Sequence, residues 1–366
     1  MKAVQQEVQQ RFPGIITTCC SAHCLDLLLN DIGKVFAVPI GEATRLASMI
    51  RNRRKLRKLV KQFQSAKGCE GQIVAVVPTR WWSTFDCITS LLVAKRAITK
   101  VARLQYHLPK SKQLMNSEMI DVVLNEGFWS ALSNLRLICE PIAEVLPCLE
   151  SDCSTISDII HAISRINHDL AEQCSRCDKQ EIRNAISALH MRYDFIETCS
   201  MHCAYLLDPR YKGEYLPSST RDAVSRFAVN QTHDASVLSS IDDFLNCRSS
   251  FSGSEIWTTE STTRISPYVW WKSFGNASPV LSKLARKLFS VPASSASSER
   301  VWSACGFIHS DVRNKLGSQK ALQAAFVYKN LQLEVPEKVK HWIPAFTGES
   351  DADYSNKSEP SDDSSD

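Results

Sequence analysis

The stretch Pro292-Ala-Ser-Ser-Ala-Ser-Ser-Glu-Arg-Val-Trp-Ser-Ala-Cys-Gly306, followed shortly by Arg313-Asn-Lys-Leu316, is the most informative part of this 366-residue sequence. Its serines are good helix N-caps, because a hydroxyl accepts a hydrogen bond from an unpaired amide of the first turn. We therefore expect a helix to begin near Ser295 or Ser298. Glu299 then lies in its first turns, where the helix dipole favours a carboxylate. Capping chemistry alone makes Glu299 an ordinary surface residue and does not demand catalysis.

Composition predicts a soluble, intracellular and largely helical protein. The hydrophobic fraction is 44%, and only 12 glycines and 14 prolines occur. Apolar residues recur near the helical period through the middle of the chain. No apolar run of about eighteen residues and no signal peptide is visible, so we expect no membrane partner. The 14 cysteines are scattered instead of framing a short loop-rich domain, which indicates reduced thiols.

The net charge of +4 conceals an asymmetry between two regions of the chain. The acidic tail, residues 348–366, has too few apolar residues to fold and is expected to be disordered. The opposite charge is concentrated in one helical segment with an apolar stripe, whose basic residues are Arg45, Arg51, Arg53, Arg54, Lys55, Arg57, Lys58, Lys61 and Lys67. Such a face is either simply solvated or contacts phosphates.

Secondary structure is predicted to begin with a mixture of strands and helices. Gly14–Cys20 and Ile73–Val77 are rich in β-branched residues and read as short buried strands. Helices are expected at 22–33, at 40–64 as one long helix, and at 79–104. A succession of amphipathic helices follows from about 117 to 289.

Several motifs together resemble the hAT superfamily of transposases. The segment from Trp270 to Leu333 is similar to the C-terminal dimerisation region of that superfamily. Its matching pieces are Trp-Trp-Lys at 270–272, Pro279-Val-Leu-Ser-Lys-Leu-Ala, the serine-rich stretch around Glu299, Arg313-Asn and Asn330-Leu. Three motifs further upstream also resemble motifs of the superfamily and occur in the same order: Cys20-Ser-Ala-His23, Thr79-Arg80-Trp81 and Leu207-Asp-Pro-Arg-Tyr-Lys212.

This resemblance implies an α/β but mostly helical fold. A partial RNase H-like core at 1–105 is interrupted by an all-helical insertion at 106–268, and the dimerisation region closes the fold at 269–335. Intact relatives hold two Mg²⁺ ions with three carboxylates, which activate the attacking oxygen and steady the leaving one. Here the resemblance supplies only Glu299. We expect both catalytic aspartates to lie upstream of this polypeptide, which is then N-terminally incomplete and carries no cofactor of its own.

Candidate binding residues follow from the same motifs. A guanidinium clamps phosphate and an indole stacks on an unpaired base, so Arg80 and Trp81 are candidates for DNA contact, although a Trp-Trp pair is also typical of a core. The basic helical segment adds Arg51, Arg53, Arg54, Lys55, Arg57 and Lys58. Predicted dimerisation residues are Trp302, Leu322, Phe326 and Leu333, with packing onto the chain's own core as the alternative.

A zinc site is an alternative interpretation, because Cys19, Cys20, His23 and Cys24 lie together in the sequence, as do Cys174 and Cys177, and Cys199, His202 and Cys203. Zinc usually takes two spaced pairs of ligands in a knuckle-like loop, and neither is evident. We interpret these cysteines as buried thiols and predict no metal site.

The sequence therefore predicts a nuclear, transposase-derived protein that forms homodimers, binds DNA and performs no strand transfer. No small-molecule substrate is expected. Three alternatives stay open: an interaction module without affinity for nucleic acid, a zinc-dependent regulator, and a fragment of an intact transposase whose start was misassigned.

Overall fold

The computed structural model describes residues 2–12, 14–65, 71–77, 81–177, 180–214, 216–308 and 317–334. Arg80, the motif at Arg313–Leu316 and the acidic tail at 348–366 lie outside these residues. The chain divides into two compact units, unit 1 at Met1–Ala296 and unit 2 at Ser297–Asp366.

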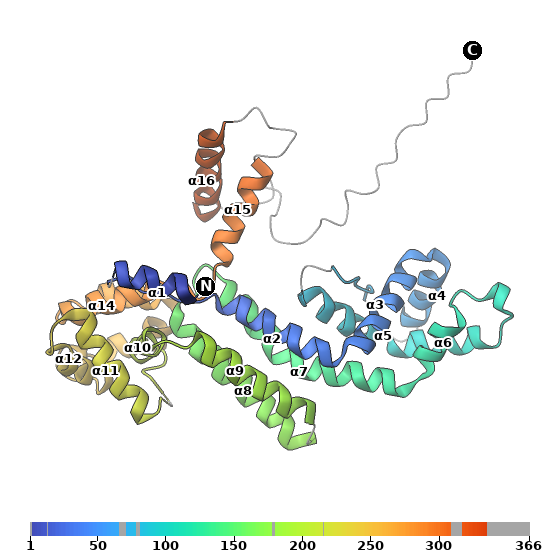
Figure 1. Ribbon diagram of the computed structural model, residues 1–366, viewed down its shortest axis with the longest axis horizontal. Helices are drawn as coiled ribbons and strands as arrows, with labels where there is room; N and C mark the ends of the chain where they lie inside the picture. The colour runs from blue at the N-terminus through green and yellow to red at the C-terminus, as the bar shows by residue number, and fades with distance from the viewer. Residues whose placement is uncertain are drawn as a thin grey trace, which may run out of the picture. The chain divides into compact units, whose positions relative to one another are not determined.

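Helices dominate the described residues of both units (Figure 1). The α-helices of unit 1 are α1 (Lys2–Arg11), α2 (Ser21–Val35), α3 (Ala37–Asn52), α4 (Arg54–Ser65), α5 (Trp81–Tyr106), α6 (Ser117–Leu124), α7 (Glu126–Glu150), α8 (Ile156–Cys177), α9 (Gln180–Ile196), α10 (Cys199–Leu207), α11 (Ser218–Thr232), α12 (Val237–Leu245), α13 (Pro267–Phe274) and α14 (Pro279–Phe289). Short helical turns are η1 (Lys110–Lys112), η2 (Ser249–Phe251), η3 (Ser254–Trp257) and η4 (Glu260–Arg264). The last two α-helices are α15 (Ala296–Ile308) and α16 (Ser318–Glu334).

Side-chain caps fix the starts of several helices. Asn116 and Asn125 accept hydrogen bonds from amides of the first turns of α6 and α7, at 3.3 and 2.8 Å. Ser266 caps α13 in the same way, and Pro267 follows at a position where its missing N–H costs nothing. Local sequence thus sets these boundaries.

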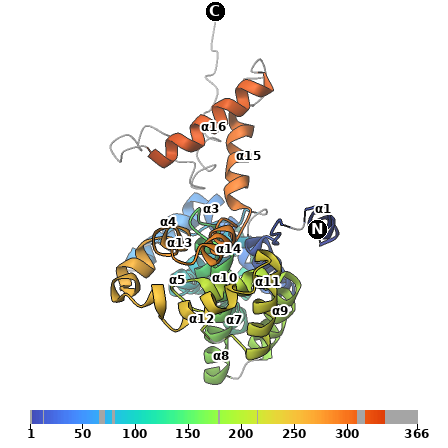
Figure 2. The same cartoon turned by 90° about the vertical axis from the view of Figure 1, so that its left-hand side faces the viewer.

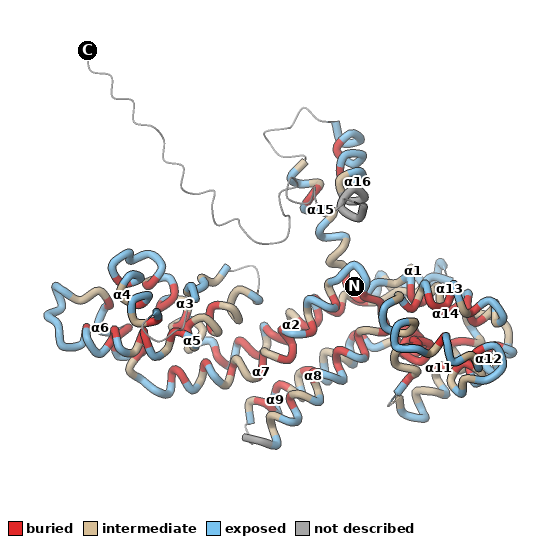
Figure 3. Tube along the Cα trace, turned by 180° about the vertical axis from the view of Figure 1, so that it is seen from behind, coloured by how far each residue is buried: buried red, intermediate tan, exposed pale blue. Residues whose placement is uncertain are grey.

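Unit 1 is built around the long helices α2, α7 and α8. Helix α7 packs on α2, α5 and α8, and α2 also packs on α9. Helices α3, α4, α5 and α6 pack on one another beside α7, whereas α10, α11, α12 and α14 form a second packed group that meets α8 (Figures 1 and 2). Buried residues run along the facing sides of these helices (Figure 3).

The two predicted strands are not formed. Residues 15–20 and 71–77 have no regular secondary structure, and among the described residues the structure has no named strand, only an isolated bridge between Thr155 and Pro292. A strand needs a neighbouring backbone to pair with. Instead, the amides of Val74 and Val77 donate to the hydroxyls of Ser90 and Ser83 on α5, at 3.1 and 2.8 Å. Tertiary context overrides the β propensity here.

The single helix predicted for 40–64 is also wrong, because the chain breaks at Arg53. This residue has an extended backbone (φ −101°, ψ 97°) and separates α3 from α4. Its amide still bonds to the carbonyl of Met49 at 3.2 Å. Its guanidinium donates to the carbonyl of Leu114, at 2.7 Å. The break therefore redirects the basic helix α4 relative to α3.

The serine-rich stretch joins distant parts of unit 1 just before α15. Ser294 donates to the carbonyl of Leu149 at the end of α7, at 2.9 Å. Ser21, at the start of α2, donates from its hydroxyl to the carbonyl of Ala293 at 2.7 Å. Ala293 and Ser294 are buried. Part of the serine-rich motif therefore ties helix ends together instead of capping a helix.

The aromatic core of unit 1 lies where α12, α13 and the turns between them meet. Trp270 and Trp271 are fully buried, and their indole nitrogens donate to the carbonyls of Ile256 and Leu207 at 3.1 and 2.8 Å. Phe244 and Phe251 pack against both indoles. The Trp-Trp pair of the predicted dimerisation region is thus a core element.

None of the described helices combines the length and the apolar character that crossing a membrane requires.

Candidate nucleic-acid interface and dimerisation surface

The predicted basic residues lie on the exposed side of α4 and the end of α3. Leu56 and Val60 of α4 are buried against the core, which leaves the opposite side of the helix to the cations. Six of the predicted DNA-binding residues are exposed there: Arg51, Arg53, Arg54, Lys55, Arg57 and Lys58. The structure thus brings these candidates together.

The fold enlarges this basic surface in a way that the sequence alone did not indicate. Residues 43–69 and 87–117 contain no Asp or Glu. Helix α4 packs directly on α5, which places the second acid-free segment beside the first. We call the following set the basic surface: the six residues above with Lys61, Lys100, Arg103, Lys110 and Lys112, all exposed.

Two contacts hold parts of the basic surface together. The Nζ of Lys100 on α5 lies 4.4 Å from the ring centroid of Phe63 on α4, a cation–π contact. Arg53 reaches the carbonyl of Leu114, just after the turn that carries Lys110 and Lys112. A hollow of about 260 Å³ adjoins the surface, and its lining includes Arg51, Arg57 and Lys61. A concave surface lined by cations suits a phosphate group.

The structure places Trp81 differently from the arrangement expected of a base-stacking residue. Trp81 is half-buried and packs against the core, whereas Trp82 is 40% exposed. A Cβ built on Gly33 of α2 would lie only 2.9 Å from Cζ2 of Trp81. The Trp81 indole therefore lies against a glycine of α2, and Trp82 is the more exposed of the two rings. Its neighbour Arg80 lies outside the described residues.

The Gly33→Ala variant tests this close packing. The added methyl collides with the rigid Trp81 ring, so we expect the free energy of unfolding to fall by about 1–2 kcal/mol. This loss is expected even though alanine stabilises a helix by about 1 kcal/mol relative to glycine. Urea denaturation followed by circular dichroism measures this. Gly41→Ala is the matched control, because nothing lies within 4 Å of its added Cβ. If Gly33→Ala is as stable as Gly41→Ala, the Trp81 ring does not pack closely against Gly33.

Glu299 lies in the first turn of α15, as the capping pattern predicted, and its side chain is exposed. A pair of Mg²⁺ ions needs several clustered carboxylates. Within the part of the chain that the structure describes, no group of three or more His, Cys, Asp or Glu side chains is placed to hold a metal ion. The described residues therefore do not form a site of this kind.

Two of the candidate zinc cysteines, Cys20 and Cys24, have other contacts, and the side chain of Cys177 lies outside the described residues. The Sγ of Cys20 accepts hydrogen bonds from the amides of His23 and Ser295, both at 3.4 Å. Cys24 donates to the carbonyl of Arg192 at 3.3 Å, and burial raises the pKa of its thiol to about 11. A zinc ligand must be a thiolate, so a protonated Cys24 suits packing better than coordination.

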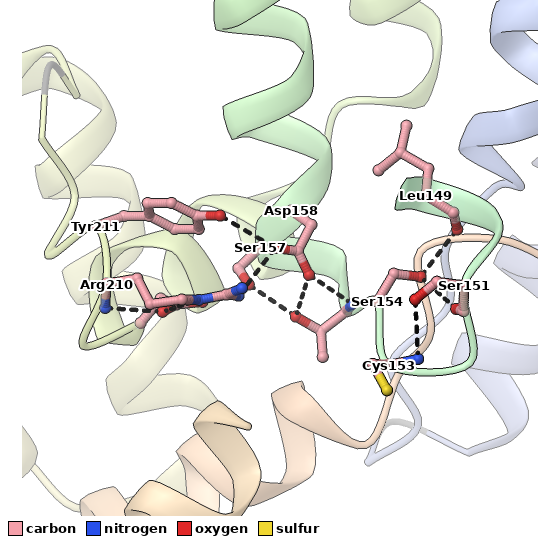
Figure 4. Close-up of polar contacts among 10 residues, drawn as sticks. Leu149, Ser151, Cys153, Ser154, Ser157, Asp158, Arg210 and Tyr211 are labelled. Atoms are coloured by element: carbon pink, nitrogen blue, oxygen red, sulfur yellow. Dashed lines mark hydrogen bonds and ion pairs between the residues drawn. The ribbon is translucent and has the colours of Figure 1, made fainter. Parts of the chain in front are cut away.

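The Leu-Asp-Pro-Arg-Tyr-Lys motif forms a buried polar cluster after α10 (Figure 4). Asp208 is fully buried and accepts hydrogen bonds from Ser157 at 2.7 Å and from Arg210 at 2.9 and 2.7 Å. Arg210 also pairs with Asp158 on α8 at 2.9 Å. Burial lowers the pKa of Arg210, but hydrogen bonds and charge from Asp208 and Asp158 more than offset it and raise the pKa above its ordinary value. The cluster is a charge-compensated clamp between α8 and the turn after α10.

Unit 2 has an unusual distribution of apolar residues. Its buried residues, among those described, are the small Ala304, Ala321 and Ala325. Five of its large apolar side chains are instead exposed: Trp302 by 70%, Phe307 by 52%, Leu322 by 64%, Phe326 by 70% and Val327 by 52%. We call these five residues the apolar surface of unit 2. Large exposed apolar residues mark interaction sites where they form a contiguous patch.

The apolar surface includes three of the four predicted dimerisation residues. Trp302 lies on α15, and Leu322 and Phe326 lie one turn apart on α16. The side chain of Leu333 lies outside the described residues. Sequence reasoning missed Phe307 on α15 and Val327 on α16. The helical spacing of α15 puts Val301, Cys305 and Ile308 on its core-facing side. Those three residues are half-buried, as expected of a core-facing side.

Comparison with known protein families identifies one part of the chain. Residues 246–331 match the family model described as the hAT family C-terminal dimerisation region. The match contains the buried Trp270 and Trp271 as well as every residue of the apolar surface of unit 2. A search of curated proteins gave no match for the chain.

Proposed function

We propose that this chain is a homodimeric DNA-binding protein. It carries the hAT family C-terminal dimerisation region at 246–331 and is related to hAT transposases through that region. The observation that carries dimerisation is the apolar surface of unit 2. Large aromatic and aliphatic side chains are exposed there while alanines are buried, the reverse of an isolated folded unit. A symmetric partner buries the same surface on both copies.

Co-purification of two differently tagged full-length chains tests self-association. Expressed together, the two chains are expected to elute on either tag in comparable amounts. Mixed after separate purification, they are expected to exchange only as fast as dimers dissociate. Recovery of one tag alone from the co-expressed sample would contradict the proposal.

DNA binding rests on the basic surface. The surface is assembled from two acid-free segments, 43–69 and 87–117, which the packing of α4 on α5 brings together. Each cation that neutralises a phosphate releases counterions from the duplex. The proposed contacts are with the phosphate backbone, and they position the chain without reading a base sequence. A dimer carries two such surfaces, one on each copy.

The triple variant Arg54→Ala, Lys55→Ala, Lys58→Ala tests the basic surface. Affinity for a fluorescent duplex is measured by anisotropy at several salt concentrations. The slope of log affinity against log salt is expected to fall by about 0.9 for each lost phosphate contact. The matched control removes three exposed cations elsewhere in unit 1, Arg226, Lys272 and Lys283.

Unchanged slopes in both variants would contradict phosphate contacts at α4. No binding by the wild-type chain at low salt would favour a protein-interaction module without nucleic-acid affinity. An equal decrease of the slope in the two variants would indicate that DNA binding depends only on the net charge of the chain.

We further propose that this chain by itself performs no strand transfer. The support is that Glu299 is exposed and that the described residues gather no three-ligand metal group. Incubation with Mg²⁺ or Mn²⁺ and duplexes that end in terminal inverted repeats is expected to give neither nicks nor hairpins. Reproducible cleavage that Glu299→Ala abolishes would overturn this.

The assignment of 1–105 to part of an RNase H-like core, and of 106–268 to its helical insertion, is also a proposal. Its support is the order of the sequence motifs, from Cys20-Ser-Ala-His23 to Leu207-Asp-Pro-Arg. Backbone pairing of 14–20 or 73–77 with other strands, detected by nuclear magnetic resonance, would support it. The contacts of 73–77 with Ser83 and Ser90, if they are kept there, would contradict it.

A further inference from the structure

Lys212 and Cys247 form a contact that neither dimerisation nor DNA binding uses. The Nζ of Lys212 donates a hydrogen bond to the Sγ of Cys247 at 2.9 Å. The two residues are 35 positions apart and come from different turns, one after α10 and the other after α12. An amine and a thiol, both nucleophiles, are thus held within reach of each other.

Aromatic side chains fix the position of the lysine. The Lys212 Nζ lies 3.4 Å from the ring centroid of Trp257 and 5.8 Å from that of Phe244. Trp257 is itself anchored, because its indole nitrogen donates to the carbonyl of Phe251 at 2.7 Å. Phe244 is fully buried. The lysine is therefore held in place from a second side, independently of the thiol.

The backbone at both residues has the left-handed conformation that side chains seldom adopt. Lys212 has φ 48° and Cys247 has φ 52°. Hydrogen bonds hold both turns: the Lys212 amide donates to Asp208 at 2.8 Å and the Arg248 amide to Asp243 at 2.8 Å. Such conformations persist only where the surroundings enforce them, and they concentrate at functional sites.

We propose that Lys212 and Cys247 are an oxidative modification site, at which hydrogen peroxide drives formation of a reversible sulfur–nitrogen bond. Both side chains are half-buried, so peroxide reaches the sulfur. First, the sulfur attacks a peroxide oxygen and the O–O bond breaks. The thiol is oxidised by two electrons to a sulfenic acid, and the peroxide is reduced to water.

The lysine then completes the reaction. The lysine ammonium first loses one proton to solvent, and the nitrogen lone pair then attacks the sulfenic sulfur, so that the N–S bond forms and the S–O bond breaks. The departing hydroxide takes the one excess proton from the nitrogen and leaves as water. The product is a sulfenamide between Lys212 and Cys247. Two equivalents of an external thiol reverse it, giving back the amine and the thiol together with a disulfide.

Several other cysteines are poor competitors for peroxide. Burial raises the pKa of Cys24 and Cys87 to about 11, and it raises the pKa of Cys139 and Cys203 still further. A thiol that stays protonated is a weak nucleophile. Cys148 and Cys153 are exposed, and they report whether peroxide has reached the protein.

The linkage joins two parts of unit 1 that the chain otherwise connects through α11 and α12. One end is the turn of the buried Asp208 cluster, and the other is the second residue of the stretch 246–331. Closing this loop restricts the unfolded chain. We expect oxidation to raise the midpoint of thermal unfolding by roughly 5 °C, which thiol reductant reverses.

Mass spectrometry of the full-length chain tests the proposal. The reduced protein is treated with hydrogen peroxide until Cys148 or Cys153 is oxidised, and the remaining thiols are alkylated before digestion. The expected product is a Lys212–Cys247 peptide pair whose mass is two hydrogens below the sum of the two peptides. Dithiothreitol is expected to remove it.

Two variants separate this chemistry from folding. Lys212→Arg keeps the positive charge and the hydrogen-bond donors but stays protonated, so its Cys247 should be trapped as sulfenic acid by dimedone. Cys247→Ser should lack the linkage altogether. Circular dichroism checks that both variants are folded. Oxidation of Cys148 and Cys153 without any Lys212–Cys247 linkage in the wild-type chain overturns the proposal, as does an equal yield of linkages from Lys212 to other cysteines.

Discussion

Asp208→Ala is expected to lower the free energy of unfolding of unit 1 by about 3–5 kcal/mol. Asp208 is fully buried, and its carboxylate accepts hydrogen bonds from Ser157 and Arg210. Removing it leaves the half-buried guanidinium of Arg210 with one carboxylate instead of two. Urea denaturation followed by circular dichroism measures the change.

Two matched variants make this result specific. Asp208→Asn keeps the shape and some of the acceptors, and Arg210 keeps its pair with Asp158 at 2.9 Å, so a smaller loss is expected. Asp242→Ala breaks a pair with Arg248 whose side chains are 60% and 64% exposed. Exposed pairs contribute about 0–1 kcal/mol. A loss for Asp208→Ala no larger than that for Asp242→Ala would mean that the cluster is not the clamp described here.

Phe326→Asp is expected to weaken self-association by roughly 30- to 1,000-fold, the range typical of losing a central aromatic contact of about 2–4 kcal/mol. Phe326 is 70% exposed on α16, so the change should leave the fold of one chain intact. In a dimer the new carboxylate is buried without a partner. Sedimentation velocity over a range of concentrations measures the shift.

The matched control for this variant is Met191→Asp in α9. Met191 is 68% exposed and lies outside 246–331. The Met191→Asp variant therefore loses a similar exposed apolar side chain and gains the same charge as Phe326→Asp, but away from the dimerisation region. We expect it to sediment like the wild-type chain. If both variants dissociate equally, the charge acts generally and the apolar surface of unit 2 is not the interface.

The sequence predicted the helical parts of this protein well and its strands poorly. Capping and apolar spacing are local, so the start of α15 beside Glu299 and the extent of α5 were found from the residues alone. The strands at 14–20 and 73–77 depend on partners elsewhere in the chain. Ser83 and Ser90 take the place of such partners for 73–77, and propensity gives no sign of that.

The candidate sites show the same division between local and distant information. The basic residues of α4 are visible as a run in the sequence, but their union with Lys100 and Lys110 needs the packing of α4 on α5. The break at Arg53 was missed because its guanidinium is held by Leu114, 61 positions away. The Lys212–Cys247 contact likewise depends on two left-handed turns that no sequence pattern marks.

Sedimentation equilibrium of the full-length wild-type chain, with Phe326→Asp beside it, tests the central claim most directly. The chain mass is 41.1 kDa. At micromolar concentration the wild-type chain is expected to have twice this mass, and Phe326→Asp is expected to have the mass of one chain. A wild-type protein that stays at the mass of one chain across the concentration range, or a variant that stays dimeric, would contradict dimerisation through the apolar surface of unit 2.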